Sequence, residues 1–160
     1  LEVGDKPWAT KDEVAHYVDL MPDGTHRQYT SIQEAKSVIT APSGGQKLLK
    51  HGYYDITGLA WSGRGTVEKV EVSVDGGRNW RGARLERPIL PKALTRFHCD
   101  WVWQGEEALL QARVTDSTGY IQPSRAQLVE IRGTRSIYHN NAIQTWRVGV
   151  DGEVHNVQLG

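Results

Sequence analysis

Arg132 has the residue type and setting that best suit recognition of a charged group. It is followed by Gly133 and, a few residues later, by the polar and aromatic stretch 138–148. We predict that it lies at the end of a strand. An arginine there, beside a flexible glycine, presents a planar and permanently charged fork to an anion. Two interpretations are open from these residues alone: an anion-binding arginine, or an arginine in a surface salt bridge.

Residues suited to metal or nucleophilic chemistry are scattered along the chain. The six histidines show no His-x-His or His-x₃-His spacing, and the single cysteine, Cys99, alternates with Phe97 and Trp101. A structural zinc site needs four convergent ligands, so we predict no metal site and a core position for Cys99. There is no Gly-x-Ser-x-Gly elbow, Walker loop or dinucleotide fingerprint either. We therefore predict no catalytic residue in this chain.

Residues 73–80, Ser-Val-Asp-Gly-Gly-Arg-Asn-Trp, look like an Asp-box hairpin, in which the Asp and Gly residues shape a turn and the Trp packs back on the strands. In sialidases such hairpins recur on successive propeller blades. Here one copy stands in a chain without a fixed-period repeat, which favours a structural role.

Strands must position these residues, because apolar and polar side chains alternate with a period of two through most of the chain. The alternation is clearest over residues 70–74, 96–103 and 110–115; residues 36–40 are predicted as a first strand, and residues 53–61 are mostly small and apolar. Glycine-containing turns separate these stretches. We predict an all-β protein: an immunoglobulin-like (E-set) two-sheet sandwich of about seven or eight strands, without the Cys–Trp–Cys signature of antibody domains.

Residues 1–32 read differently and are predicted to form a mostly irregular N-terminal extension with one short helix. Thr10 and Glu13 fit a capping box, and the turn signal Pro22-Asp23-Gly24 predicts that the helix ends near Met21. The sandwich is expected to occupy residues 33–160.

Composition narrows the class of protein. The 160 residues carry 19 Lys and Arg against 19 Asp and Glu, which argues against a nucleic-acid partner because such domains carry a basic excess. No apolar run is long enough to cross a bilayer, so no membrane partner is expected. The chain begins with Leu1 and shows no export signal, so we expect a processed chain or a piece of a longer protein.

Several stretches, in order along the chain, resemble the C-terminal dimerisation domain of the molybdenum-cofactor sulfite oxidase superfamily. The stretches are residues 34–42, 58–63, 70–80, 111–116, 120–123 and 132–142. Within the superfamily, residues 1–8, 19–24, 138–146 and 152–157 are most similar to the SoxC type, the molybdenum subunit of sulfane dehydrogenase. The resemblance covers about residues 33–148.

This resemblance implies a sandwich that joins two identical subunits about a two-fold axis. It also implies a parent enzyme with molybdenum–molybdopterin, which oxidises sulfite or sulfane in bacterial thiosulfate oxidation. A cytochrome subunit and a sulfur-carrier protein would be its partners in the periplasm. The arginine of the family's Arg-Gly motif binds substrate, and the matching residue here is Arg132.

The cofactor domain of that superfamily, with its cysteine ligand to molybdenum, has no counterpart in these 160 residues. The resemblance therefore implies that the chain binds no cofactor by itself and is inactive alone. A stand-alone immunoglobulin-like binding module, in which exposed Trp and Tyr side chains hold a glycan or a protein and which has no catalytic role, is the alternative.

Overall fold

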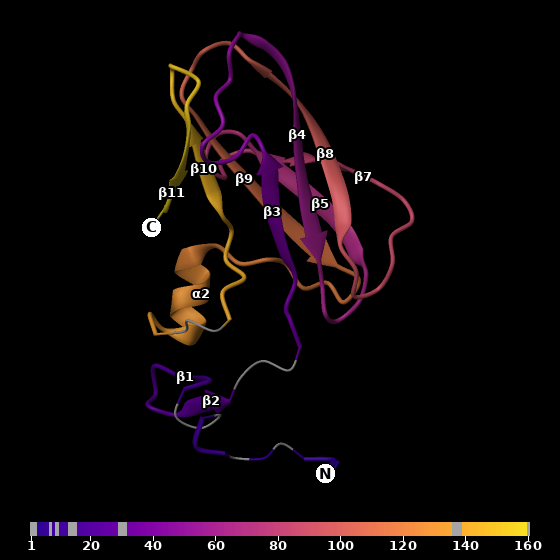
Figure 1. The fold of residues 1–160 in the computed structure, drawn as a ribbon, viewed down its shortest axis with the longest axis vertical. Coiled ribbons are helices and arrows are strands. Elements are labelled where there is room, and N and C mark those ends of the chain that lie inside the picture. Colours follow the sequence, from indigo (N-terminus) through magenta and orange to yellow (C-terminus); the bar gives the residue numbers. More distant parts are fainter. Residues whose placement is uncertain are drawn as a thin grey trace.

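Two antiparallel sheets form the body of the molecule in the computed structural model (Figure 1). The structure describes residues 3–6, 8, 10–12, 16–28, 32–135 and 139–159. The strands of the two sheets are β3 (Lys36–Ala41), β4 (Gly52–Trp61), β5 (Val67–Ser73), β6 (Arg81–Gly82), β7 (Arg84–Leu85), β8 (Thr95–Trp103), β9 (Ala108–Asp116), β10 (Thr145–Val148) and β11 (Val154–Val157).

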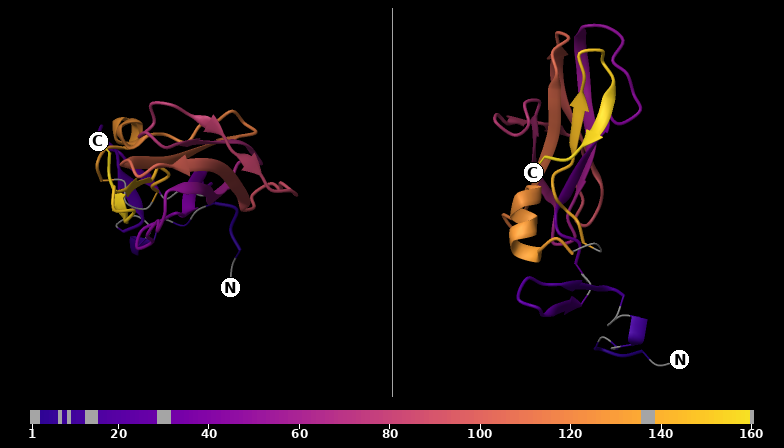
Figure 2. Two further views of the ribbon diagram at one scale, coloured as in Figure 1. Left: turned by 90° about the horizontal axis from the view of Figure 1, so that it is seen from above. Right: turned by 90° about the vertical axis from the view of Figure 1, so that its left-hand side faces the viewer.

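One sheet has the order β11-β10-β9-β5-β6 and the other has the order β3-β4-β8-β7. The views in Figure 2 show the two layers lying face to face. All strand pairs within these sheets are antiparallel, and β4 and β8 pair over the longest stretch, from Gly52↔Trp103 to Ala60↔Thr95. The predicted all-β, immunoglobulin-like sandwich is confirmed.

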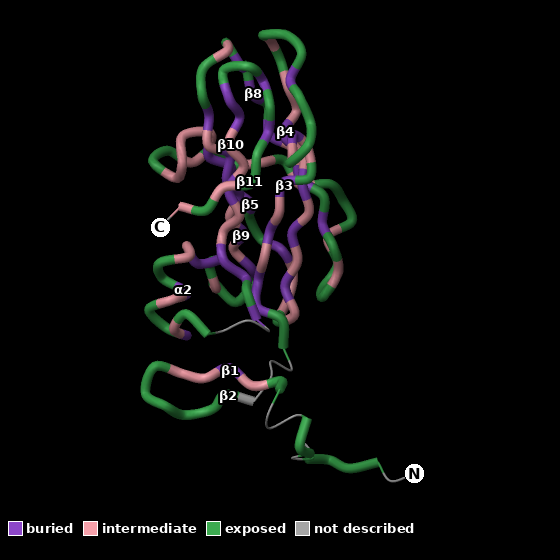
Figure 3. Tube along the Cα trace, turned by 60° about the vertical axis from the view of Figure 1, so that its left-hand side comes forward, coloured by how far each residue is buried: buried purple, intermediate pink, exposed green. Residues whose placement is uncertain are grey.

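The core lies between the sheets because the long strands turn alternate side chains inward over much of their length. Strand β8 alternates buried residues with exposed or half-buried ones along its whole length. Figure 3 shows the buried positions following the strands of the body. Core side chains come from both sheets, among them Ile56, Phe97, Trp101, Leu110 and Val148. Cys99 is 6% exposed and belongs to this core, as predicted.

The Asp-box stretch forms a turn after β5. The Asp75 carboxylate accepts hydrogen bonds from the backbone N–H groups of Arg78 (3.0 Å) and Asn79 (2.9 Å), and Gly76 takes a positive φ of 76°. Hydrogen bonds, first from the Asn79 backbone and side chain, hold the pKa of Asp75 far below its ordinary range. The predicted structural role of this stretch is confirmed.

The prediction of a strand ending at Arg132 is wrong, because residues Arg125–Arg132 form a helix, α2. Ser124 caps its N-terminus: the Ser124 hydroxyl accepts from the Gln127 N–H (3.2 Å), and the Gln127 side chain accepts from the Ser124 N–H (2.9 Å). This reciprocal capping box begins a helix directly after Pro123. Leu128 and Arg132, four residues apart, are the buried residues of α2.

The N-terminal extension contains a hairpin that the sequence did not predict. Strands β1 (Val18–Leu20) and β2 (His26–Gln28) pair antiparallel around the turn at Asp23, whose carboxylate accepts from the Thr25 N–H at 2.9 Å. Lys11 and Asp12 are helical, and residues 13–15 lie outside the described residues. The predicted helix end near Met21 is wrong, because the chain is already extended at β1 to pair with β2.

Figure 1 shows this hairpin below α2, apart from the sandwich. The expected boundary between residues 32 and 33 stays a prediction. No helix that the structure describes is long and apolar enough to span a membrane.

Candidate functional site

Helix α2 carries the one site residue that the sequence singled out, Arg132, at its last position. The Arg132 side chain is 2% exposed and points into the space between α2, the hairpin β1–β2 and the chain leading into β3. Gly133 ends the helix with a positive φ of 73°, and its N–H donates to the Val129 carbonyl at 2.7 Å. The structure thus gives an ion pair, but a buried one rather than a surface salt bridge.

Glu34 is the centre of the polar cluster around this arginine. Its Oε2 atom accepts from Arg132 Nη2 at 3.0 Å and from the Tyr120 hydroxyl at 3.1 Å, and it lies 3.2 Å from His139 Nε2. The other carboxylate oxygen, Oε1, lies 3.5 Å from Arg64 Nη2. One carboxylate therefore holds groups from four separate parts of the chain.

The second acid beside the arginine comes from the hairpin. Asp19 Oδ2 lies 3.7 Å from Arg132 Nη1, and Asp19 is 4% exposed. Arg132 Nη1 is buried and makes no hydrogen bond, whereas Nη2 is engaged by Glu34. One arm of the guanidinium is thus fixed, and the other faces a carboxylate at ion-pair distance only.

The Gln122 side chain joins the two sheets next to this cluster. Gln122 Oε1 accepts from the Ser37 N–H (2.9 Å) and hydroxyl (2.7 Å) on β3, and from the Val114 N–H (3.3 Å) on β9. Asn141 Nδ2 donates to the Tyr120 hydroxyl (3.0 Å) and the Ala35 carbonyl (3.2 Å). The chain before β3 is therefore tied to the chain after β9.

The charges in the cluster shift the pKa values of its members. Burial raises the pKa of Glu34, but the Arg132 charge and the Tyr120 hydrogen bond outweigh it, so this pKa lies below its ordinary value. Burial and the Arg132 charge together lower the pKa of His139, against the pull of Glu34. Burial raises the pKa of Tyr120, so its hydroxyl remains a donor.

Arg132 gives this cluster a permanent cation that is buried and lies between two carboxylates, Glu34 and Asp19. A guanidinium stays protonated throughout the ordinary pH range, and its planar fork matches oxyanions and carboxylates. A hydrogen bond to Glu34 holds one side of this fork in place.

Comparison with known proteins identifies the family of this chain. A family model, the Mo-co oxidoreductase dimerisation domain, matches residues 27–146. The chain belongs to this family.

Relatives of two kinds are similar to this chain. Sulfite oxidase of Gallus gallus is 34% identical over 120 residues, which is 69% of this chain and 26% of that enzyme. A nitrate reductase [NADH] of Solanum lycopersicum is 32% identical over 103 residues, which is 56% of this chain and 11% of that enzyme.

The crystal structure of the sulfane dehydrogenase SoxCD from Paracoccus pantotrophus is also similar. It matches with a TM-score of 0.93 and 52% identity, over 98% of this chain and 40% of that one. The resemblance to the SoxC type is confirmed. The chain spans well under half the length of these proteins, about a quarter of the Gallus gallus enzyme.

The Mo-co enzymes of this family imply a molybdenum cofactor, and the described residues of the dimerisation domain do not fit one. They contain no group of three or more His, Cys, Asp or Glu side chains able to hold a metal ion. Burial raises the pKa of Cys99, which disfavours the thiolate that a metal ligand needs. No step through the cofactor is therefore assigned to these residues.

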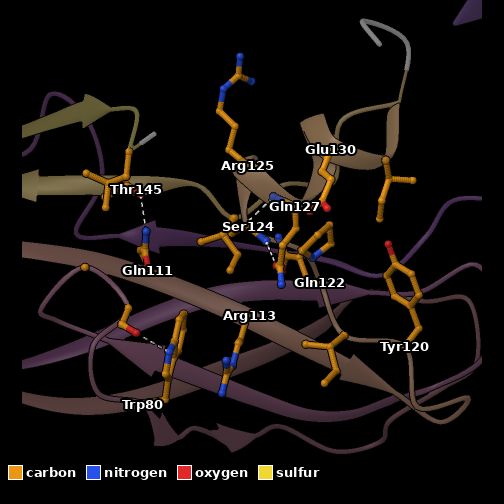
Figure 4. A pocket seen from close by; sticks show the side chains of 17 residues that line it. Trp80, Gln111, Arg113, Tyr120, Gln122, Ser124, Arg125, Gln127, Glu130 and Thr145 are labelled. Atoms are coloured by element: carbon orange, nitrogen blue, oxygen red, sulfur yellow. Dashed lines mark hydrogen bonds between the residues drawn. The ribbon is translucent and has the colours of Figure 1, made fainter. Parts of the chain in front are cut away.

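A separate hollow lies on the outer face of the β9 sheet beside α2 (Figure 4). It measures about 820 Å³ and does not include Arg132. Trp80 forms part of its wall, with the Arg113 guanidinium 4.3 Å from the ring centroid. Arg113 is also paired with Glu71 at 2.9 Å, so its charge is already matched.

Most members of the Arg132 cluster were not predicted. His139 and Asn141 lie within the polar and aromatic stretch that drew attention to Arg132, so that stretch was a real signal. Glu34 is 98 residues from Arg132 in the sequence, and Asp19 comes from the unpredicted hairpin. No pattern along the chain links these acids to the arginine.

Proposed function

We propose that this chain is the dimerisation domain of a SoxC-like, molybdenum-dependent sulfite or sulfane dehydrogenase of bacterial sulfur oxidation. In that enzyme it donates Arg132 as a substrate-binding residue. The observation that carries the proposal is the buried guanidinium held by Glu34 at 3.0 Å, in a chain 52% identical to SoxCD.

The role of Arg132 is to bind and position. Nη2 is fixed by Glu34, and Nη1 makes no hydrogen bond, so Nη1 is the arm that addresses an anionic sulfur–oxygen group. The Asp19 carboxylate stands 3.7 Å from Nη1, where such a group would compete with it. The molybdenum cofactor, supplied by the rest of the enzyme, would carry out the oxygen-transfer chemistry.

The proposal extends to the oligomeric state, the partners and the compartment of the whole enzyme. It is a homodimer that joins through this domain, and it works with a cytochrome subunit and a sulfur-carrier protein in the periplasm. The upstream coding sequence tests this setting: it should encode a cysteine-containing cofactor domain and a twin-arginine export signal, and its lack of both would contradict the proposal.

Arg132→Lys in the complete enzyme tests the arginine. Lysine keeps the charge but loses the planar fork, so we expect kcat/KM for the sulfur substrate to fall by about tenfold or more. Molybdenum content and melting temperature are measured in parallel to exclude misfolding. Arg147→Lys, at an exposed pair with Glu107, is the matched control. Unchanged kcat/KM in Arg132→Lys would show that the assignment is wrong.

Sedimentation of the chain tests dimerisation against the stand-alone binding module. A symmetric dimer at micromolar concentration is expected. A strict monomer, both alone and within the complete enzyme, would instead favour the binding module.

A further inference from the structure

A second polar recess borders the Glu34 cluster: Glu34, His139 and Asn141 belong to both, whereas Arg132 does not line the recess. It measures about 440 Å³ and is formed by the start of β3, the end of β4, the loop before β8 and residues 139–141. Lys36 and Lys92 line it, together with Trp61 and the Asn140 amide. The recess combines two cations with an aromatic wall.

Neither lysine has an acidic partner within 4 Å among the described residues. Lys36 is half-buried, and its ammonium donates to the Asn140 carbonyl at 2.5 Å, which satisfies a hydrogen bond but leaves the charge uncompensated. Burial lowers the pKa of Lys36, the direction expected for a cation without a counter-ion.

Glu34 is the one carboxylate among the described lining residues, and it does not neutralise these lysines. Its two oxygens are directed at Arg132, Tyr120, His139 and Arg64. Glu34 therefore offsets little of the positive charge that Lys36 and Lys92 bring to the lining of the recess.

The backbone conformation of Lys92 is a separate observation that points to a role for this residue in the recess. Lys92 has a φ of 58°, the only positive φ among the described non-glycine residues, and its N–H donates to the Gly65 carbonyl at 3.0 Å. Glycine or asparagine would adopt this left-handed conformation with less strain. A lysine at such a position costs free energy of folding, as residues at binding sites often do.

We propose that this recess is a binding site for a small oxyanion, such as sulfate, sulfite or phosphate, held between the ammonium groups of Lys36 and Lys92. The Asn140 amide nitrogen is a third donor, because its amide oxygen already accepts from the Ala142 N–H at 3.1 Å. Trp61 adds an aromatic side chain to the lining. This site goes beyond the proposed role of Arg132 and does not depend on the molybdenum enzyme.

Isothermal titration of the 160-residue chain with sodium sulfate, sulfite and phosphate at low ionic strength tests the site. Sodium chloride at matched ionic strength corrects for screening. We expect saturable 1:1 binding, with affinity reduced about tenfold or more by Lys36→Met and by Lys92→Gly. Lys47→Met, at an exposed pair with Glu153, is the control and should bind as the wild type does.

Lys92→Gly separates binding from folding. Because glycine tolerates the backbone conformation of residue 92, this variant should melt at the same or a higher temperature while its affinity falls. Tighter binding of sulfate or sulfite assigns the site to a sulfur oxyanion, and tighter binding of phosphate assigns it to a phosphate group. An absence of saturable binding, or wild-type affinity in both lysine variants, would overturn the proposal.

Discussion

At the scale of single residues, Glu34 decides whether the Arg132 cluster exists. Burial removes water from the Glu34 carboxylate. Its Oε2 atom gains the contacts with Arg132, Tyr120 and His139 in place of that water. Such a pair adds little net stability over an apolar replacement, whereas removing one member leaves a buried charge unmatched. The main contribution of Glu34 to the free energy of unfolding therefore comes from pairing the buried charge of Arg132, which it also orients.

Glu34→Ala should lower the free energy of unfolding by about 3–5 kcal/mol, because it leaves the Arg132 guanidinium buried with only the more distant Asp19 acid. Urea denaturation measures the change. Glu153→Ala removes an exposed carboxylate 3.5 Å from Lys47 and should cost less than about 1 kcal/mol. Equal losses in the two variants would contradict a buried, structurally essential ion pair.

His98 shows the opposite electrostatic effect on the outer face of β8. Its Nδ1 lies 2.6 Å from Asp55 Oδ2 and its Nε2 lies 2.7 Å from Glu86 Oε1. The Asp55 bond, followed by the Glu86 bond, raises the pKa of His98 above its ordinary value of 6.5. The charged form is thus favoured in the folded protein.

The stabilising contribution of His98 should therefore be fully present below pH 6.5 and be lost as the pH rises through its raised folded-state pKa. The difference in unfolding free energy between wild type and His98→Gln, measured from pH 5 to pH 9, should shrink across that window. An NMR titration of the His98 ring gives the pKa directly. A value at or below 6.5 would refute the expectation.

Among the elements, helix α2 has two ends with different structural roles. Ser124 and Gln127 begin the helix, and Arg132, two turns later, projects into the polar cluster. The direction of Arg132 therefore depends on a cap that does not touch the cluster.

Ser124→Ala should destabilise the protein by about 1 kcal/mol, since it removes the acceptor for the Gln127 N–H. Ser124→Asp keeps an acceptor and should stay close to wild type. Thermal melts compare the variants, and hydrogen exchange of the α2 amides locates the effect. Equal exchange rates in Ser124→Ala and wild type would show that the cap does not hold the helix.

The sequence predicted the long strands well and α2 not at all, for a physical reason. Strands β4, β8 and β9 bury one face, so the period of two is visible in their residues. Helix α2 buries only Leu128 and Arg132, and one of these is charged. Its residues therefore show almost no apolar periodicity that would predict a helix. Its capping box at Ser124 was the readable signal.

At the scale of the whole molecule, the sandwich closes tightly where β4 crosses the core. A Cβ at Gly58 would overlap the Phe97 ring and the Val38 carbonyl, so this position has no room for a side chain. Both neighbours belong to strands paired with β4 in the same sheet.

Gly58→Ala should therefore lower the unfolding free energy by about 1–3 kcal/mol through overpacking. Gly82→Ala is the matched control, because nothing lies within 4 Å of a Cβ at that position. Chemical denaturation followed by tryptophan fluorescence measures both. A Gly58→Ala variant as stable as Gly82→Ala would mean that β4 can shift at no cost.

The distances along the chain within the Arg132 cluster determine when the cluster can form during synthesis. Glu34 is separated from Arg132 by 98 residues and from His139 by 105. Contacts of such long range form late, after the loops between them have closed. A nascent chain can pair β3 with β4 long before residue 132 is made, and until then Glu34 has no cation from α2. An intact Arg132–Glu34 pair thus marks a chain whose synthesis has passed α2 and whose N-terminal and C-terminal parts have come together.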